Sequence, residues 1–195
     1  MDSQNQLEEK TPPPIQLKTV RLTLRPFTRE DAPLIEVLLN DKEIASNTRS
    51  VDFPYPQGAA LIWIENQIAN REKFDAFVFG IHLNGSDELI GGIGVDLNKK
   101  DHNAELGYWS GREFWNQGYC SEAAMSVLEF GFEEVGLYKI HAHYMTRNPA
   151  SGRVLEKIGM TQEGKLRGHT RKWGVFEDIV VCGMLANDPR PWEQD

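Results

Sequence analysis

The sequence predicts a single α+β domain built on one mixed β-sheet. Strand-like runs are grouped early in the chain, one long amphipathic helical pattern lies in the middle, and two further strand-like runs close the chain. A helical crossover joins parallel strands, whereas strands joined by short turns run antiparallel. Because the chain shows both connections, we expect parallel and antiparallel strands in the same sheet. The length of 195 residues fits one domain.

Alternation and helix-start signals locate the elements of the first half of the chain. Arg21, Thr23 and Arg25 alternate with apolar residues, which is the pattern of a half-buried strand. Thr28 and Asp31 are typical of a helix N-terminus. We therefore expect a disordered tail over 1–16, a strand over 20–26, a helix that begins within 28–31, a loop over 40–57 and a second helix over 58–71.

The second half contains hairpins, a crossover helix and a short helix. Asn84 and Gly85 lie in a typical hairpin turn. Ala124, Leu128 and Val135 share one face of the long helix, with acidic residues opposite. We expect strands over 74–83, 88–98 and 104–110, a helix over 121–135, a strand over 138–145, a helix over 150–158, strands over 160–167 and 174–185, and a tail over 187–195, so that the domain spans 17–186.

Composition argues against several classes of function. The chain has 21 Lys and Arg against 29 Asp and Glu, a net charge of −8, whereas a nucleic-acid binder presents a basic surface. An acidic surface is compatible with amine substrates, and equally with simple solubility. No apolar run is long enough to span a membrane, no signal peptide is evident, and two cysteines make no disulfide framework. We expect a cytoplasmic protein that binds neither nucleic acids nor membranes.

The stretch from Phe114 to Ala123 is the first candidate for a ligand site. Gly118 follows a strand-like run and precedes the long helix, so backbone N–H groups at the helix N-terminus are free to bind a phosphate. No Gly-Lys-Ser/Thr follows, which excludes a Walker P-loop, and a single glycine does not make a dinucleotide fingerprint. Taken alone, a glycine before a helix is more often an ordinary turn.

Three blocks taken together carry a family resemblance. They are Glu-Leu-Gly-Tyr-Trp at 105–109, Trp-Asn-Gln-Gly-Tyr-Cys-Ser-Glu-Ala at 115–123, and Asn-Pro-Ala-Ser-Gly-Arg-Val-Leu-Glu-Lys-Ile-Gly at 148–159. In this order they resemble the GCN5-related N-acetyltransferase (GNAT) superfamily, and most of all its Rim-type branch, which includes the ribosomal-protein N-terminal acetyltransferases. Asn116 replaces the usual glycine and Cys120 replaces the usual small residue.

The resemblance implies a fold, a cofactor and a reaction. The implied fold is a mixed sheet of six to seven strands with about four helices, in which the strands 104–110 and 138–145 are parallel and splay apart. The pantetheine arm of acetyl-CoA then lies in the split, and the acetyl group passes to a primary amine, on a protein N-terminus or a small molecule. The segment 40–57 would overhang that acceptor. Its sequence is equally consistent with a simple connection between two helices. The alternative is a non-catalytic acyl-CoA-binding or interaction module on the same fold.

The resemblance also assigns cofactor-binding residues. The backbones of Tyr108 and Ser110 are expected to bind the pantetheine amides as an added strand would. Asn148 is expected to bind the pantetheine or to order its own turn, and Trp115 to act mainly in packing. The residues expected around the pyrophosphate are Asn116, Gln117, Gly118, Tyr119, Cys120 and Ser121. Three basic residues could reach the 3′-phosphate, although solvated surface charge is the safer interpretation: Arg112, Arg153 and Lys157.

Two residues are candidates for catalysis. Glu105 opens the strand that should hold the thioester, and by resemblance it is the general base, with burial expected to raise its pKa. The alternative is that Glu105 is an ordinary edge-strand carboxylate with no catalytic role. Ser151 is the candidate general acid, by resemblance near the leaving thiolate, and it also sits where a first-turn serine caps a helix. A non-catalytic module would need neither residue.

Further expectations concern cysteine, histidine and assembly. A thiol at a helix N-terminus, as at Cys120, should have a lowered pKa, yet an acyl-cysteine intermediate is disfavoured because no histidine neighbour is indicated. His141 and His143 stand at strand spacing without a carboxylate or cysteine nearby in the sequence, so we expect no metal site. A homodimer is possible, but the sequence does not locate its face.

Overall fold

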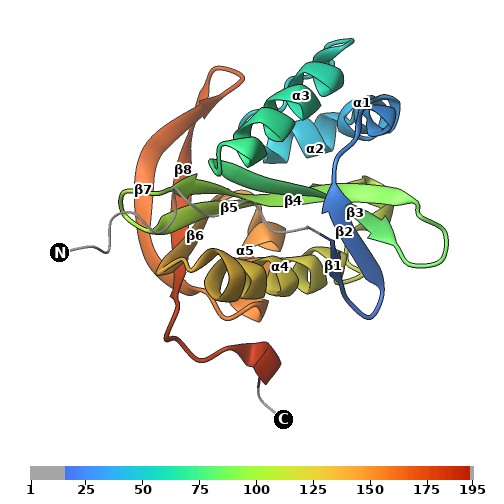
Figure 1. Cartoon of the computed structure of the whole chain (residues 1–195). Coiled ribbons are helices and arrows are strands. Elements are labelled where there is room, and N and C mark those ends of the chain that lie inside the picture. The colour runs from blue at the N-terminus through green and yellow to red at the C-terminus, as the bar shows by residue number, and fades with distance from the viewer. Residues whose placement is uncertain (1–15, 194–195) are drawn as a thin grey trace.

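The computed structural model describes residues 16–193, which form an eight-stranded mixed sheet between two layers of helices (Figure 1). The strands lie in the order β1-β2-β3-β4-β5-β6-β8-β7. All neighbours are antiparallel except β5 and β6. The strands are β1 Leu17–Lys18, β2 Leu22–Pro26, β3 Ala76–Leu83, β4 Leu89–Asn98, β5 Asn103–Ser110, β6 Lys139–Met145, β7 Thr161–Lys172 and β8 Val175–Leu185.

Helices cover both faces of the sheet. One face carries the N-terminal helices and the other carries the two helices that flank β6 (Figure 1). The first group is α1 Ala32–Leu39, α2 Lys42–Asn47 and α3 Ala59–Glu72, and the second is α4 Tyr119–Phe130, which continues as a π-helical turn over Gly131–Val135, and α5 Pro149–Lys157. Short 3-10 turns lie at Arg29–Asp31, Arg112–Phe114 and Pro191–Glu193.

The main core lies between the sheet and α4. Val127 and Leu128 are completely buried there, and Phe130 meets the rings of Phe77 and Phe79 edge to face. Each such side chain contributes about 1.5–3 kcal/mol on burial. Gly131 permits the close approach of β6, because a Cβ there would lie 2.6 Å from Ile140 Cδ1. The apolar face read from the sequence therefore fixes α4 across the sheet.

The parallel pair β5–β6 opens into a split, as expected. Pairing is confined to three positions, which join residues 103–105 to residues 139–141. Beyond them β5 continues along β4 as far as Ser110, while β6 continues along β8 as far as Met145. Backbone groups on the facing edges of β5 and β6 are thus left for another partner.

The structure corrects several expected elements. Residues 16–193 contain eight strands rather than six or seven, and five α-helices rather than about four. The extra helix, α2, lies in the segment expected to be a loop, where the Asp41 side chain accepts hydrogen bonds from the N–H groups of Glu43 and Ile44. Val20 does not belong to the expected first strand and is 94 % exposed. Most of the expected N-terminal tail, residues 1–15, lies outside the described residues.

The expected C-terminal tail packs on the domain as far as it is described. Arg190 forms an ion pair with Glu133 at 2.6 Å and lies over the ring of Phe132. Trp192 packs against the main core, and Pro191 lies against Gly159. Sequence patterns alone did not indicate that Pro191 and Trp192 pack on the domain.

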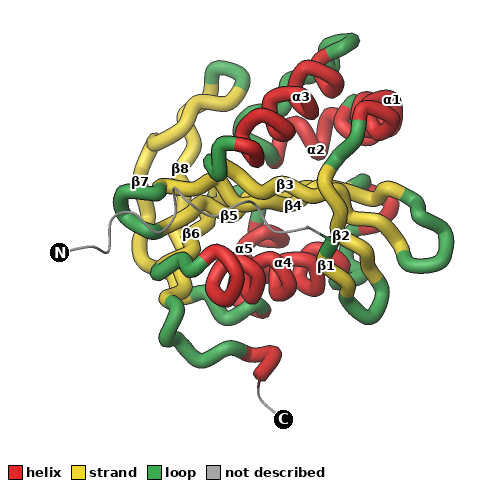
Figure 2. The backbone as a smooth tube through the Cα atoms, viewed as in Figure 1, coloured by secondary structure: helices red, strands yellow, loops and turns green. Residues whose placement is uncertain are grey.

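The last two strands form a hairpin that is longer than the sequence indicated. It extends to Lys172 and Val175, and its tip lies on the same side of the sheet as α1–α3 (Figure 2). Lys172 is buried, and its Nζ donates to the Val51 carbonyl at 2.6 Å. This bond ties the hairpin to the segment between α2 and α3. No helix in residues 16–193 is both long and apolar enough to cross a membrane.

Candidate active site

A groove of about 820 Å³ runs along the split between β5 and β6. Its walls come from β4, β5, β6, the start of α4, α5 and the segment after α2. The sequence-predicted residues that line it are Glu105, Tyr108, Ser110, Trp115, Asn116, Gly118, Tyr119, Cys120, Ser121, Asn148 and Ser151. Gln117 and Arg112, which were also expected at the cofactor, lie outside this lining. A second cavity of about 520 Å³, beside α2, contains none of the sequence-predicted residues that line the groove.

The loop before α4 has the backbone geometry of an anion site. Asn116 and Gly118 have φ values of 59° and 82°, in the left-handed region that glycine and, less readily, asparagine adopt. This explains why asparagine is accepted where the resembled family usually has glycine. The first helical bond runs from the Glu122 N–H to the Gly118 carbonyl. The three N–H groups before it, at residues 119–121, have no acceptor within the helix.

Arg21 holds this loop in place from the other end of the chain. Its Nε donates to Glu122 Oε2 at 2.6 Å, and its Nη1 donates to the Gln117 carbonyl at 3.0 Å. The guanidinium also lies over the Tyr119 ring, 4.6 Å from the centroid. The Gln117 side chain is exposed on the outside of the loop, where it donates to the Glu113 carbonyl at 2.8 Å. Nothing in the sequence indicated this role of Arg21, because the contact joins residues about 100 positions apart in the chain.

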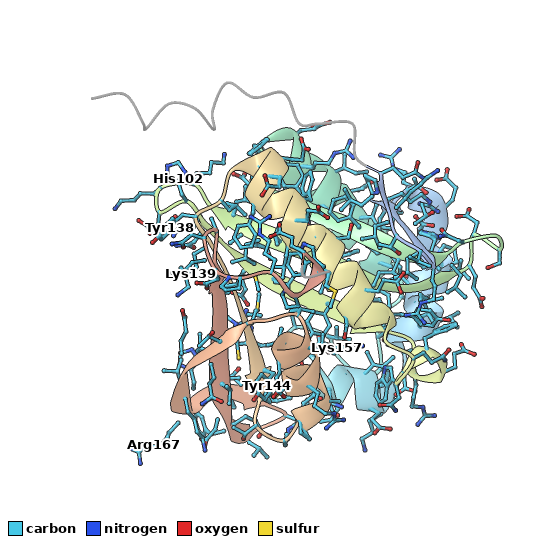
Figure 3. The ribbon with its side chains drawn as sticks, turned by 90° about the horizontal axis from the view of Figure 1, so that it is seen from below. His102, Tyr138, Lys139, Tyr144, Lys157 and Arg167 are labelled. Carbon is cyan, nitrogen blue, oxygen red and sulfur yellow. The ribbon has the colours of Figure 1, made fainter. Side chains whose placement is uncertain are left out.

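Basic side chains stand near the free N–H groups. Arg153 and Lys157 line the groove, and Figure 3, seen from the side of α4 and α5, labels Lys157 at the end of α5. Arg112 does not join them. Its guanidinium pairs with Asp41 and Glu43 on the α2 side, each at 3.3 Å, so its expected reach to a 3′-phosphate is not supported.

Tyr108 and Ser151 form a hydroxyl pair across the groove. Their oxygens lie 2.7 Å apart, and the Tyr108 hydroxyl also donates to the Ser151 carbonyl at 3.1 Å. Burial raises the pKa of Tyr108, which keeps the phenol protonated. Asn148 caps α5, since its Oδ1 accepts from the Ser151 N–H at 3.3 Å. The expected capping role of Ser151 is therefore wrong, and its hydroxyl is instead paired with that of Tyr108.

Ser110 links the loop to β5. Its carbonyl accepts a hydrogen bond from Trp115 Nε1 at 3.0 Å, so this carbonyl is already engaged. The Cys120 thiol donates to the Ser110 hydroxyl at 3.5 Å. Burial raises the pKa of Cys120, although the hydrogen bond to Ser110 opposes the rise. The expectation of a lowered pKa is wrong, because desolvation of the thiolate is the larger influence and outweighs the hydrogen bond to Ser110.

Acidic and imidazole groups form a row on the other face of the split. Glu105 pairs in register with Asp96 on β4 and with His141 on β6. His143, two residues further along β6, places Nδ1 2.9 Å from Glu105 Oε1. Arg49, from the segment after α2, places Nη2 3.3 Å from the same oxygen. None of these neighbours of Glu105 was indicated by the sequence.

The pKa of Glu105 is lowered, which corrects the expected rise. The hydrogen bond from His143 is the largest cause and outweighs partial burial, and electrostatic interactions with His143 and Arg49 act in the same direction. Glu105 is therefore ionised at neutral pH but is a weaker proton acceptor than expected. The pKa of Asp96 is raised, by desolvation of its carboxylate and by the charge of Glu105. Burial lowers the pKa of His141, despite the nearby Glu105.

The two candidate catalytic groups approach the split from opposite faces. Ala104 and Leu106 point into the core under α4, so Glu105 between them points to the α1–α3 face. Tyr108 shares the orientation of Leu106, and accordingly its hydroxyl meets Ser151 on α5. A group held within the split would have a carboxylate on one side and a hydroxyl pair on the other.

The row also contains a set of side chains able to hold a metal ion. Glu105, His141 and His143 offer one ligand atom each, all within 4.8 Å of one another. The expectation that the two histidines have no carboxylate near them is therefore wrong. Glu105 is distant along the chain and is brought to them by the parallel pairing of β5 with β6.

Comparison with known proteins identifies the fold. Residues 21–161 match the family model described as "Acetyltransferase (GNAT) domain". The chain belongs to the GNAT acetyltransferase family. It is accordingly an acetyl-CoA-dependent N-acetyltransferase, as the three sequence blocks implied.

Relatives cover nearly the whole of this GNAT chain. The uncharacterized N-acetyltransferase YoaA of Bacillus subtilis is 34% identical over 175 residues, 87% of this chain and 96% of the relative. The [ribosomal protein uS5]-alanine N-acetyltransferase of Escherichia coli is 25% identical over 186 residues, 92% of this chain and 95% of the relative. A Vibrio cholerae spermidine N-acetyltransferase, solved with CoA and spermine, has a TM-score of 0.75 at 24% identity and covers 86% of this chain and 97% of its own, a likeness that shows the fold alone.

Proposed function

We propose that this GNAT protein transfers the acetyl group of acetyl-CoA directly to a primary amine, with Glu105 as general base and Ser151 as general acid. The observation that carries the proposal is the placement of these two groups on opposite faces of the β5–β6 split. The thioester occupies the split in this proposal, so that the amine approaches on the Glu105 side and the thiolate leaves toward Ser151.

The loop before α4 is the proposed binding site for the pyrophosphate of acetyl-CoA. The free N–H groups at residues 119–121 and the positive end of the helix dipole attract anionic oxygens. Gly118 allows the close approach, Arg21 fixes the loop, and Arg153 and Lys157 add positive charge. The uncovered edges of β5 and β6 offer hydrogen bonds to the pantetheine amides.

The proposed reaction moves two protons. The amine nitrogen forms a bond to the acetyl carbon, the carbon–sulfur bond breaks, and the electron pair leaves with sulfur. Glu105, in contact with His143, accepts the proton of the attacking amine, directly or through one water. Ser151 gives its proton to the thiolate, and the adjoining Tyr108 hydroxyl stabilises the serine oxygen. Transfer is direct in this proposal, because desolvation raises the pKa of the Cys120 thiol and makes it a poor nucleophile at neutral pH.

The acceptor is proposed as a primary amine without a finer identity. Asp96 and Glu105 place two carboxylates where an ammonium group would arrive, which favours cationic acceptors. The segment that carries Arg49 and Val51 lines the same groove and is tied down by Lys172, so it is in place to contact the rest of the acceptor. Among relatives, acceptors named in the comparisons include a ribosomal protein and a polyamine.

A thiol-release assay tests the proposal. The protein is incubated with acetyl-CoA and a panel of polyamines, amino acids and peptides with free N-termini, and CoA is detected as free thiol. We expect amine-dependent release of CoA with at least one class. Acetyl-CoA should also raise the melting temperature, as a ligand of the folded state does. Thermal protection without release for any amine would favour the alternative, a non-catalytic acyl-CoA-binding module.

A further inference from the structure

The cluster of Glu105, His141 and His143 is built from two strands at the point where their pairing ends and the split begins. Glu105 and His141 are the last registered pair of β5 and β6, and His143 follows on the same face of β6. Their ligand atoms all lie within 4.8 Å of one another. Each of the three residues is half-buried, and two of them line the 820 Å³ groove.

Two imidazoles and one carboxylate form a typical ligand set for zinc and related divalent ions. Ligand atoms at about 2.0–2.2 Å from one ion lie no more than roughly 4.4 Å apart, so the observed spacing closes with a small rotation of side chains. Such a set leaves at least one coordination position open toward the groove. The histidine rings meet edge to face, with centroids 5.6 Å apart, and do not stack on each other.

The surrounding charges have opposite effects on a bound cation. Asp96 faces the cluster from β4 and favours a cation, as does Glu163 near His141. Arg49 opposes it, because its guanidinium now contacts Glu105 Oε1 at 3.3 Å. The side chain of Arg49 is 58 % exposed and this is its one ion pair among the described residues, so it can turn into solvent at little cost. Lys139 is held by Glu163 at 2.6 Å.

The geometry points to a binding site for a divalent transition-metal ion, of which Zn²⁺ is the representative, formed by Glu105, His141 and His143. The ion has no part in the proposed acetyl transfer. Because it binds the carboxylate that the proposed function assigns to the attacking amine, it competes with the acceptor amine and not with acetyl-CoA. Only this consequence depends on the proposed function, whereas the metal site itself does not.

Metal binding is measured first, on the full chain without a histidine tag. Zn²⁺ is titrated by calorimetry and by competition with a chromogenic chelator, and Co²⁺ is titrated by its visible absorption. We expect one equivalent to bind, and His141→Ala and His143→Ala each to weaken binding by about tenfold or more. His169→Ala is the matched control, since His169 is exposed on β7 and outside the cluster. Melting curves without metal establish that the variants fold.

Two results would overturn the metal site: no saturable binding of Zn²⁺ or Co²⁺, or binding that is equally weakened by His169→Ala and by His141→Ala. Inhibition is measured next, by CoA release with the best amine of the panel. We expect Zn²⁺ to raise the KM for the amine and to leave the KM for acetyl-CoA unchanged. Binding without inhibition would refute the overlap with the acceptor site. A protein that binds Zn²⁺ but releases no CoA with any amine would keep the metal site and refute the proposed function.

Discussion

Replacement of Glu105 by glutamine is the most direct test of the catalytic assignment. The amide keeps the volume of the side chain, and its oxygen can still accept from His143 and Arg49, which now lie 2.9 Å and 3.3 Å from Oε1. The ion pair with the exposed Arg49 contributes less than about 1 kcal/mol. We therefore expect Glu105→Gln to fold and to melt close to the wild type.

The effect on turnover should be much larger. General-base catalysis contributes about 10²- to 10⁴-fold, which corresponds to roughly 2.7–5.4 kcal/mol in the activation free energy. Affinity for acetyl-CoA should be nearly unchanged, because the pyrophosphate loop lies at the start of α4 and does not contact Glu105. The loss should consequently appear in kcat, measured by CoA release under saturating acetyl-CoA, and not in thermal protection by acetyl-CoA.

Asp96→Asn provides the matched comparison. Asp96 faces Glu105 across the β4–β5 pair, and its pKa is raised, so it is the other carboxylate able to accept a proton there. We expect Asp96→Asn to lose less than tenfold in kcat. Near-normal turnover of Glu105→Gln together with a large loss in Asp96→Asn would refute the assignment and transfer the role to Asp96. Equal small losses in both variants would leave deprotonation to solvent.

Three further variants test the loop, the thiol and a buried ion pair. Gly118→Val should abolish thermal protection by acetyl-CoA, whereas Gly136→Val, which has a similar positive φ but lies away from the groove, should keep it; retained protection in Gly118→Val would refute the loop assignment. Cys120→Ala should keep most activity, and wild-type Cys120 should react slowly with iodoacetamide near pH 7.5, since burial raises its pKa; loss of turnover in a folded variant would favour an acyl-cysteine intermediate. Asp31 is buried, which alone would raise its pKa, yet its hydrogen bonds, chiefly from Arg25, hold the pKa below the ordinary value. Its stabilisation is therefore present above about pH 4 and is lost as the pH falls through the folded-state pKa. Asp31→Asn should lower the free energy of unfolding by about 2–3 kcal/mol at neutral pH, and urea titrations should show this difference shrink in acid; a difference that is constant with pH would refute the reasoning.

The sequence by itself determined most of the elements and the turn before α4. Periodicity located the long helix and every strand except the two-residue β1. It could do so because a periodic pattern depends only on residues close together in the chain. The loop before α4 was readable for the same reason: a glycine, a helix start and the intervening residues are consecutive. The three blocks, read in order, were sufficient for the family. The one helix missed, α2, is six residues long, and its cap at Asp41 was the available signal.

Only the tertiary structure decided the chemical state of the candidate site. The pKa of Glu105 depends on His143 and Arg49, which come from another strand and from the far side of the groove. Arg21 holds the loop before α4 from about 100 residues away, and Asn148 rather than Ser151 caps α5. Hydrogen bonds and ion pairs act over a few ångströms whatever the separation along the chain, and a pKa reports the sum of them. A sequence lists the groups that can take part, but only the folded chain brings particular groups within that range.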